Sequence, residues 1–276
     1  MNLVVQGPGA EPQRAAELAR MTGARAIEGL GARAFRLRDA APADAVGAWC
    51  ESRDIDWAWV PPGRRFAALR LVAMDMDSTL ITIECIDEIG GMLGIKDRIA
   101  AITAAAMRGE IDYAASLRQR VALLAGLGVE ALERVYTDKL RLSPGAESLV
   151  ARCQSAGIRL LLVSGGFSFF TDRLKSRLGL DYTLSNRLEL RDGRLTGALI
   201  GDIVDAQAKA AKFRDVAATL GAAREQTVAI GDGANDLAMM AEAGWSVAFR
   251  AKPVVRAQAS CAFMHCGLDG LVNLYE

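Results

Sequence analysis

The sequence lacks the features on which several classes of protein depend. Histidine occurs once, at His265, and the five cysteines form no C-x-x-C pair, which argues against a zinc site and favours reduced thiols. The 33 basic and 33 acidic residues cancel, so no overall field attracts nucleic acid or an anionic membrane. Residues 1–12 lack a signal-peptide pattern, and the apolar segment 160–170 is too short to span a bilayer. We expect a soluble, cytoplasmic protein that binds neither nucleic acid nor membrane.

Residues 1–68 form a separate small module in this interpretation. The sequence has 276 residues with 51% hydrophobic content, enough for one large or two modest domains. Apolar runs predict strands at 3–6, 24–27, 33–37 and 55–60, and periodic segments predict helices at 11–21 and 44–52. The order β-α-β-β-α-β is that of a ferredoxin-like module. No ligand signature is visible in it, so a stabilising, dimerising or regulatory role stays open.

The rest of the chain alternates strands with helices around a helical insertion. A buried strand is predicted at 69–74, but residues 84 to about 140 contain no good strand and repeat apolar residues at helical spacing. Further on we expect a helix at 169–178, followed by strands at 182–190 and 194–200 joined by the turn dipeptide Asp192-Gly193. The insertion is therefore predicted to be a helical cap on an α/β domain.

Polar residues gather where three predicted strands end. Asp75-Met76-Asp77-Ser78-Thr79 follows the strand at 69–74, and the strands at 158–163 and 227–230 are followed by Ser164-Gly165-Gly166 and by the segment 231–236. In an open parallel sheet, ligands bind just beyond such carboxyl ends. Lys209 lies in a helical stretch between the last two segments. Carboxylates, a hydroxyl, an ammonium and glycine turns are suited to a phosphate beside a magnesium ion.

This ordered set of motifs resembles the haloacid dehalogenase superfamily, and it is closely similar to its phosphoserine phosphatases. The four matching segments are Asp75–Leu80, Val163–Gly166, Asp202–Lys209 and Gly231–Asp236. The resemblance implies an α/β fold with a Rossmann-like parallel sheet, a catalytic domain at 69–276 and a cap inserted at about 84–140. Residues 1–68 loosely resemble the amino-acid-sensing (ACT-like) modules that some phosphoserine phosphatases carry.

The resemblance also assigns catalytic roles. Asp75 would be the nucleophile that forms an aspartyl-phosphate, and Asp77 the general acid and base. Lys209 would place a positive charge beside the phosphate and Asp75. The implied Mg²⁺ ligands are the Asp75 side chain, the Asp77 backbone carbonyl and the Asp232 side chain, with Asp236 behind them. Phosphate contacts are implied for Ser164, the Gly165 amide and Asn235.

Substrate selectivity is implied to come from two further charged residues. Glu84 matches the acid that meets the substrate's amino group, and Arg120 matches the arginine that binds its carboxylate. The predicted function is magnesium-dependent hydrolysis of O-phosphoserine, the last step of L-serine biosynthesis, by a protein that forms a homodimer or acts alone. One alternative keeps the chemistry but uses another small phosphomonoester or transfers the phosphoryl group to a second alcohol. Another is an amino-acid-binding regulatory protein with an inactive hydrolase domain, which the intact set Asp75, Asp77, Lys209 and Asp232 argues against.

Overall fold

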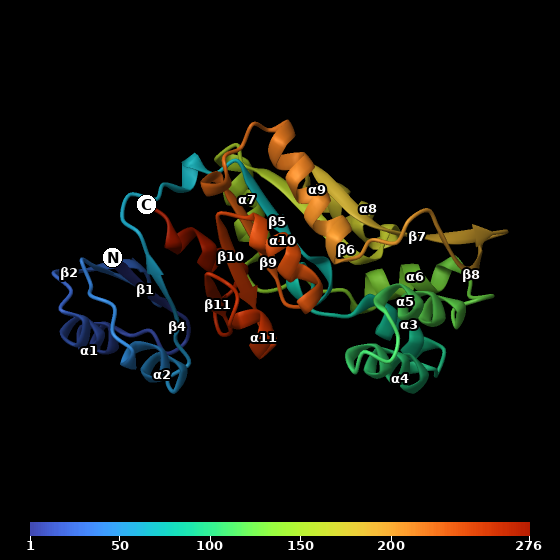
Figure 1. The fold of residues 1–276 in the computed structure, drawn as a ribbon, viewed down its shortest axis with the longest axis horizontal. Helices are drawn as coiled ribbons and strands as arrows, with labels where there is room; N and C mark the ends of the chain where they lie inside the picture. Colours follow the sequence, from blue (N-terminus) through green and yellow to red (C-terminus); the bar gives the residue numbers. More distant parts are fainter.

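A computed structural model describes all of residues 1–276 and contains two separate sheets (Figure 1). The larger sheet has seven strands in the order β11-β10-β9-β5-β6-β7-β8, and every neighbouring pair is parallel except β7 with β8. Its strands are β5 (Leu71–Met74), β6 (Arg159–Phe167), β7 (Tyr182–Arg191), β8 (Arg194–Ile200), β9 (Thr227–Gly231), β10 (Trp245–Phe249) and β11 (Cys261–Phe263). The chain passes from β5 to β6 on one side and later returns to β9 on the other, so the strand order reverses at β5. In such sheets this is where a ligand crevice forms.

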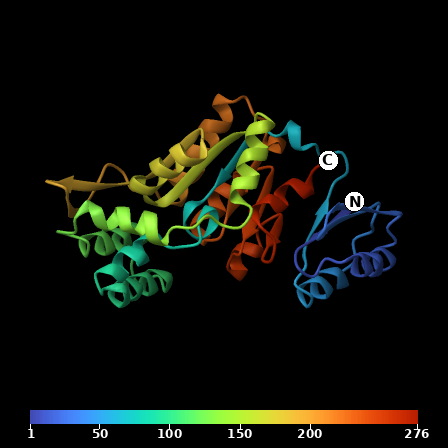
Figure 2. The same cartoon turned by 180° about the vertical axis from the view of Figure 1, so that it is seen from behind.

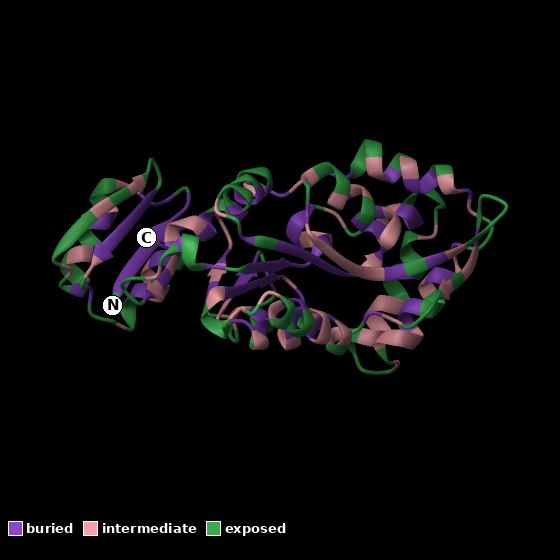
Figure 3. Ribbon diagram, turned by 90° about the horizontal axis from the view of Figure 1, so that it is seen from above, coloured by how far each residue is buried: buried purple, intermediate pink, exposed green.

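Helices cover both faces of the seven-stranded sheet. Val72 and Met74 belong to the apolar cluster that contains helices α7 (Ala146–Ser155) and α8 (Ser168–Leu178). Leu71 and Ala73 belong to the cluster that contains α9 (Ala206–Thr219), α10 (Leu237–Glu242) and α11 (Pro253–Arg256). Successive side chains of a strand point to opposite faces, so a strand covered on both faces is a continuous apolar run. Figure 3 shows these strands as buried between partly exposed helices.

A helical cap is inserted between β5 and β6. It contains α3 (Cys85–Met92), α4 (Lys96–Met107), α5 (Tyr113–Ala122) and α6 (Val129–Arg134). The hairpin of β7 and β8 extends from the sheet over α5 and α6, as Figures 1 and 2 show. Leu195 in this hairpin accepts a hydrogen bond from Gly126 N at 2.7 Å and donates one to Leu127 O at 2.8 Å. The cap is thus tied to the sheet by the hairpin as well as by the chain itself.

The N-terminal module is a four-stranded antiparallel sheet with two helices on one face. Its elements are β1 (Asn2–Gln6), α1 (Pro12–Thr22), β2 (Ala26–Gly31), β3 (Ala34–Arg38), α2 (Ala45–Glu51) and β4 (Asp56–Val60). The strand order is β2-β3-β1-β4, and all pairs are antiparallel. This is the ferredoxin-like arrangement expected from the order of the elements. The predicted fold class, a Rossmann-like core with a helical cap and an ACT-like module, is confirmed.

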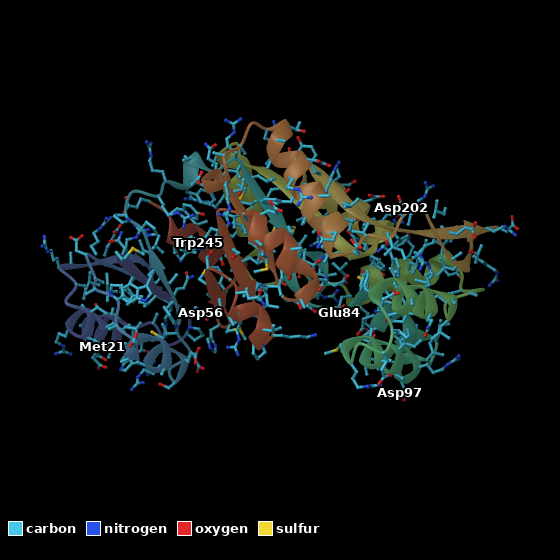
Figure 4. All side chains as sticks on the ribbon, viewed as in Figure 1. Met21, Asp56, Glu84, Asp97, Asp202 and Trp245 are labelled. Atoms are coloured by element: carbon cyan, nitrogen blue, oxygen red, sulfur yellow. The ribbon has the colours of Figure 1, made fainter.

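The face of the module without helices packs on the end of the large sheet. Asp56 is buried there and accepts hydrogen bonds from the backbone amides of Met264, His265 and Cys266 at 2.8, 2.9 and 2.7 Å. Buried Arg36 donates to the carbonyls of Asn273, at 3.0 Å, and Tyr275. Figure 4 places Asp56 between the module and the core. Two buried charges of opposite sign are therefore both satisfied by main-chain groups of the last thirteen residues.

The structure adds elements that we did not predict from the sequence. Strands β10 and β11 extend the sheet beyond β9, and the second of them has only three residues. Strand β6 continues to Phe167, past the expected end at Val163. No helix combines the length and the apolar character needed to cross a bilayer.

Candidate active site

Asp75 and Asp77 lie where β5 leaves the sheet. The Asp75 amide still donates to Ile230 O of β9 at 3.0 Å, so the first aspartate is held by the strand ladder. The chain then turns through Met76–Leu80, and Ser78 adopts a left-handed backbone with φ of 57°. A non-glycine residue at positive φ is strained and is common at functional sites. The turn directs the second carboxylate toward the cap.

Lys209 and two carboxylates form a buried cluster behind this turn. The Nζ atom of Lys209 contacts Asp75 Oδ1 and lies 2.8 Å from Asp236 Oδ1, and all three residues are buried. Asp236 is further held by the amide of Gly233, which donates to its Oδ2 at 3.0 Å. Burial lowers the pKa of Lys209, but attraction to Asp236 and Asp75 outweighs burial and leaves its pKa raised. One buried lysine thus faces two buried acids.

Carboxylates exceed positive charge around this cluster. Oxygens of Asp75, Asp232 and Asp236 lie within 4.8 Å of one another, a spacing at which they could hold a metal ion. Burial, together with Asp236, raises the pKa of Asp75 well above its usual range, and Lys209 only partly offsets this. Burial and Asp236 likewise raise the pKa of Asp232 to about 7. Hard oxygen donors with uncompensated negative charge fit a divalent cation such as Mg²⁺.

Asp77 is fixed by hydrogen bonds on both of its oxygens. The backbone amide of Cys85, at the start of α3, donates to Oδ1 at 2.9 Å, and Ser164 Oγ donates to Oδ2 at 3.4 Å. Burial and the charge of Glu84 raise the pKa of Asp77 to about 7. A carboxyl group with such a pKa can both give and accept a proton near neutral pH.

A cavity of about 600 Å³ opens between the strand ends and the cap. The predicted residues that line it are Asp75, Asp77, Glu84, Arg120, Ser164, Gly165, Asp232 and Asn235. Lys209 and Asp236 do not line it and lie behind Asp75. Figure 4 places Glu84 between the core and the cap. The structure therefore brings the acids, the arginine and the hydroxyl to one cavity, with the lysine in its wall.

Three residues of the cavity make contacts that we did not predict from the sequence. Ser78 Oγ donates to Glu84 Oε1 at 2.7 Å, and the Tyr113 hydroxyl of the cap donates to Gly165 O at 3.3 Å. Lys252, directly before α11, lines the cavity and lowers the pKa of Glu84, although desolvation dominates and leaves that pKa raised. Ser78 lies inside a recognised motif, so its strained turn could have been suspected, but nothing in the sequence marks Lys252.

Comparison with known proteins identifies the family. The profile of the haloacid dehalogenase-like hydrolases matches residues 72–241, well over half of the chain, and a domain of unknown function (DUF4072) matches residues 3–46. The chain belongs to the haloacid dehalogenase-like hydrolases.

Its relatives within this family include phosphoserine phosphatases. The phosphoserine phosphatase of Polaromonas sp. strain JS666 is 54% identical over 220 residues, which are 78% of this chain and 93% of that protein. A probable phosphoserine phosphatase from Vibrio cholerae has a TM-score of 0.87 at 36% identity and covers 99% of this chain and 85% of its own. A HAD family hydrolase from Salmonella enterica serovar Typhi has a TM-score of 0.91 at 31% identity, covering 100% of this chain and 98% of its own. The chain therefore falls among the phosphoserine phosphatases of the family.

Proposed function

We propose that this protein hydrolyses O-phosphoserine to serine and phosphate with Mg²⁺, through an aspartyl-phosphate, as the last step of L-serine biosynthesis. The observation that carries the proposal is one cavity that holds Asp75 at its base and both Glu84 and Arg120 on its walls. A phosphorylated amino acid needs these three kinds of contact, one for the phosphoryl group, one for the ammonium and one for the carboxylate. The names of the relatives support the same substrate.

Asp75 acts as the nucleophile. Its carboxylate oxygen attacks phosphorus, the bond between phosphorus and the serine oxygen breaks, and Asp77 gives its proton to the departing oxygen. Asp77 then takes a proton from water, whose oxygen attacks phosphorus and breaks the bond to Asp75, so phosphate leaves. The contact of Lys209 with Asp75 supports this role, since a buried ammonium favours the anionic form of the carboxylate and orients it.

The metal-binding residues are Asp75, Asp232 and the main-chain carbonyl of Asp77. Both oxygens of Asp236 already accept hydrogen bonds, from Lys209 and Gly233, which supports an orienting role for it behind the ligands. When bound, Mg²⁺ polarises the phosphoryl group and reduces its repulsion from Asp75.

The remaining residues bind the substrate. Ser164, the Gly165 amide and Asn235 donate hydrogen bonds to phosphoryl oxygens, Glu84 binds the ammonium and Arg120 binds the carboxylate. Glu84 is supported by the hydroxyl of Ser78, and Arg120 is held by its own helix through a 3.4 Å bond from Nε to Ser116 O.

The chain divides in this proposal into a module at 1–68 and a catalytic domain at 69–276 with its cap at about 84–140. The module packs its open face on the catalytic domain, which favours a stabilising role. A homodimer through the module remains a prediction, which light scattering of the purified protein tests.

All five cysteines are free and four are buried, which supports a cytoplasmic location.

The proposed function is tested by steady-state turnover of phosphoserine, phosphothreonine and phosphoglycolate, with and without Mg²⁺. We expect phosphoserine to give the highest kcat/KM by at least about tenfold, since it alone satisfies both Glu84 and Arg120 without an added methyl group. Chelation should abolish turnover. A higher kcat/KM for phosphoglycolate would overturn the substrate assignment while leaving the chemistry intact.

The nucleophile is tested by Asp75→Asn. This variant should lose turnover and should no longer be labelled on the chain by radioactive phosphate from the substrate, while Asp202→Asn, on the exposed approach to α9, should behave as the parent. Near-normal turnover of Asp75→Asn would show that another residue attacks phosphorus.

A further inference from the structure

Asn186 of β7 is a buried polar residue that plays no part in the proposed reaction. Asn186 is only 2% exposed, and both polar atoms of its side-chain amide form hydrogen bonds. Nδ2 donates to the Gly165 carbonyl at 2.8 Å, and Oδ1 accepts from the Val204 amide at 2.8 Å. A single side chain thus joins two segments that lie far from it in the sequence.

The first of these bonds reaches a loop that the sheet does not hold by regular pairing. Strands β6 and β7 pair in register as far as Val163 with Leu184, and then only Phe167 pairs with Asn186. Four residues advance on β6 while two advance on β7, so the segment 164–166 bulges out of the ladder. The Gly165 carbonyl lies in this bulge and finds its partner in the core through Asn186 instead of through a neighbouring strand.

The second bond reaches the start of the helix that carries Lys209. Val204 directly precedes Asp205, whose side chain caps α9 by accepting from Ala208 N at 2.8 Å. The Lys209 amide in turn donates to Asp205 O at 3.0 Å. Asn186 therefore fixes the distance between the loop of Ser164 and Gly165 and the first turn of the lysine helix.

The Gly165 carbonyl has a second donor, from the cap. The Tyr113 hydroxyl lies 3.3 Å from it, which is longer than the bond from Asn186. A cap that moves away takes this hydroxyl with it, whereas Asn186 belongs to the sheet and stays. The core bond is thus the one that holds the loop whatever the position of the cap.

We propose that Asn186 is a positioning residue for the phosphate, which sets the loop of Ser164 and Gly165 against Lys209 before the substrate binds. The inference rests on the proposed function, since it takes these groups to be the phosphate contacts. Asn186 does not touch the substrate. Its effect should appear in the steps that depend on phosphate geometry and not in recognition of the amino acid portion.

The test is Asn186→Asp, which keeps the shape and the acceptor for Val204 but replaces the donor to Gly165 with an oxygen. The matched control is Thr171→Val, which removes the 2.8 Å bond between Thr171 Oγ1 and Ser185 Oγ, next to Asn186 on β7. Thr171 is also fully buried, so the control reproduces the loss of a buried hydrogen bond without touching the loop. Melting temperature is recorded for both variants.

The informative measurements are product inhibition by inorganic phosphate and by L-serine, together with kcat on phosphoserine and p-nitrophenyl phosphate. In Asn186→Asp we expect kcat to fall about 10- to 100-fold on both substrates and phosphate inhibition to weaken about tenfold, since misplacement of catalytic groups by about 1 Å costs this much. Inhibition by L-serine should change less than about threefold, and Thr171→Val should leave all four values near those of the parent.

Two outcomes would count against the inference. A lower melting temperature with unchanged kcat and phosphate inhibition would make Asn186 purely structural, and equal weakening of phosphate and serine inhibition would make its effect general. If Asn186→Asp does not fold, Asn186→Ser, which cannot reach Gly165 and adds no charge, serves for the same measurements. If the parent protein hydrolyses p-nitrophenyl phosphate but not phosphoserine, the proposed substrate is wrong. The role of Asn186 is then decided by kcat on p-nitrophenyl phosphate and by phosphate inhibition.

Discussion

Ser78 Oγ donates a 2.7 Å hydrogen bond to Glu84 Oε1, across the strained turn that follows the two aspartates. The bond connects the phosphate end of the cavity with the residue that we assign to the substrate's ammonium. The left-handed backbone of Ser78 is what carries its hydroxyl to Glu84 rather than to the sheet. The turn Met76–Leu80 therefore both carries Asp77 and, through Ser78, supports Glu84 for substrate recognition.

Ser78→Ala should raise the KM for phosphoserine about 3- to 10-fold, because a hydrogen bond to a charged group that is partly open to solvent is lost. Activity on p-nitrophenyl phosphate should change less than about twofold, since that compound has no ammonium. Ser78→Gly provides the control for backbone strain: it also lacks the hydroxyl but adopts positive φ freely. Equal losses on both substrates would mean that the hydroxyl acts on the phosphate.

Arg120→Ala should raise the KM for phosphoserine about 100-fold and leave kcat within about threefold, since a charge-assisted contact to the carboxylate is removed. Arg118 lies two residues earlier on α5 but is exposed and does not line the cavity. Arg118→Ala is therefore the matched control and should behave as the parent. Steady-state kinetics on the two variants test whether Arg120 binds the substrate carboxylate. Similar effects from both would mean that Arg120 acts only through the overall positive charge of α5.

The stability of the metal-free protein should depend on pH through the carboxylate cluster. The pKa values of Asp77 and Asp232 are about 7 in the folded chain, whereas an exposed aspartate has a pKa near 4. Between these values the folded state binds more protons than the unfolded state, so these groups make the free energy of unfolding fall as pH rises from about 4.5 to about 7.5. In urea titrations the loss relative to an Asp77→Asn/Asp232→Asn variant should exceed about 2 kcal/mol.

Mg²⁺ should reverse this loss. It competes with protons for the carboxylate oxygens of Asp75 and Asp232, so the rise in melting temperature on adding Mg²⁺ should be larger at about pH 7.5 than at about pH 5. Differential scanning fluorimetry at the two pH values measures it. An equal rise at both would indicate that the cation binds elsewhere.

Asp56→Asn should lower the free energy of unfolding by about 2–4 kcal/mol, because the partly buried amides of residues 264–266 lose part of their acceptor. Asp54→Asn, at a side chain 72% exposed, is the control and should change it by less than about 0.5 kcal/mol. The kcat of folded Asp56→Asn should equal that of the parent, since Asp56 lies at the far end of the sheet from the cap. A change in kcat without a change in stability would indicate a regulatory coupling between module and site.

Much of the site could be predicted from the sequence because its motifs are local. Asp75 and Asp77 are two residues apart at the end of an apolar run, and the strand, the turn and the carboxylates are all visible within that window. The fold class followed from the order of such windows. The short strands β10 and β11 could not be predicted, since three to five residues carry too little periodicity and are stabilised by the sheet that they join.

Contacts between segments distant in the sequence could not be predicted. Asn186 lies 21 residues from Gly165 and 18 from Val204, and an asparagine in a predicted hairpin strand suggests a solvent-exposed side chain and not a contact with a bulged loop. The module showed its own alternation of strands and helices, but nothing marked Asp56 and Arg36 as the charges that meet the last residues of the sequence. Such partners are main-chain groups, which every residue has and which no residue type therefore reveals.

The attachment of Asp56 and Arg36 to residues 264–275 has a consequence for biosynthesis. The module is synthesised some two hundred residues before these partners, so it emerges from the ribosome with an uncovered sheet face and without the amides that Asp56 binds in the folded protein. That face can close only after residues 264–275 have left the ribosome, and a chain stalled before that point would expose it to chaperones and proteases.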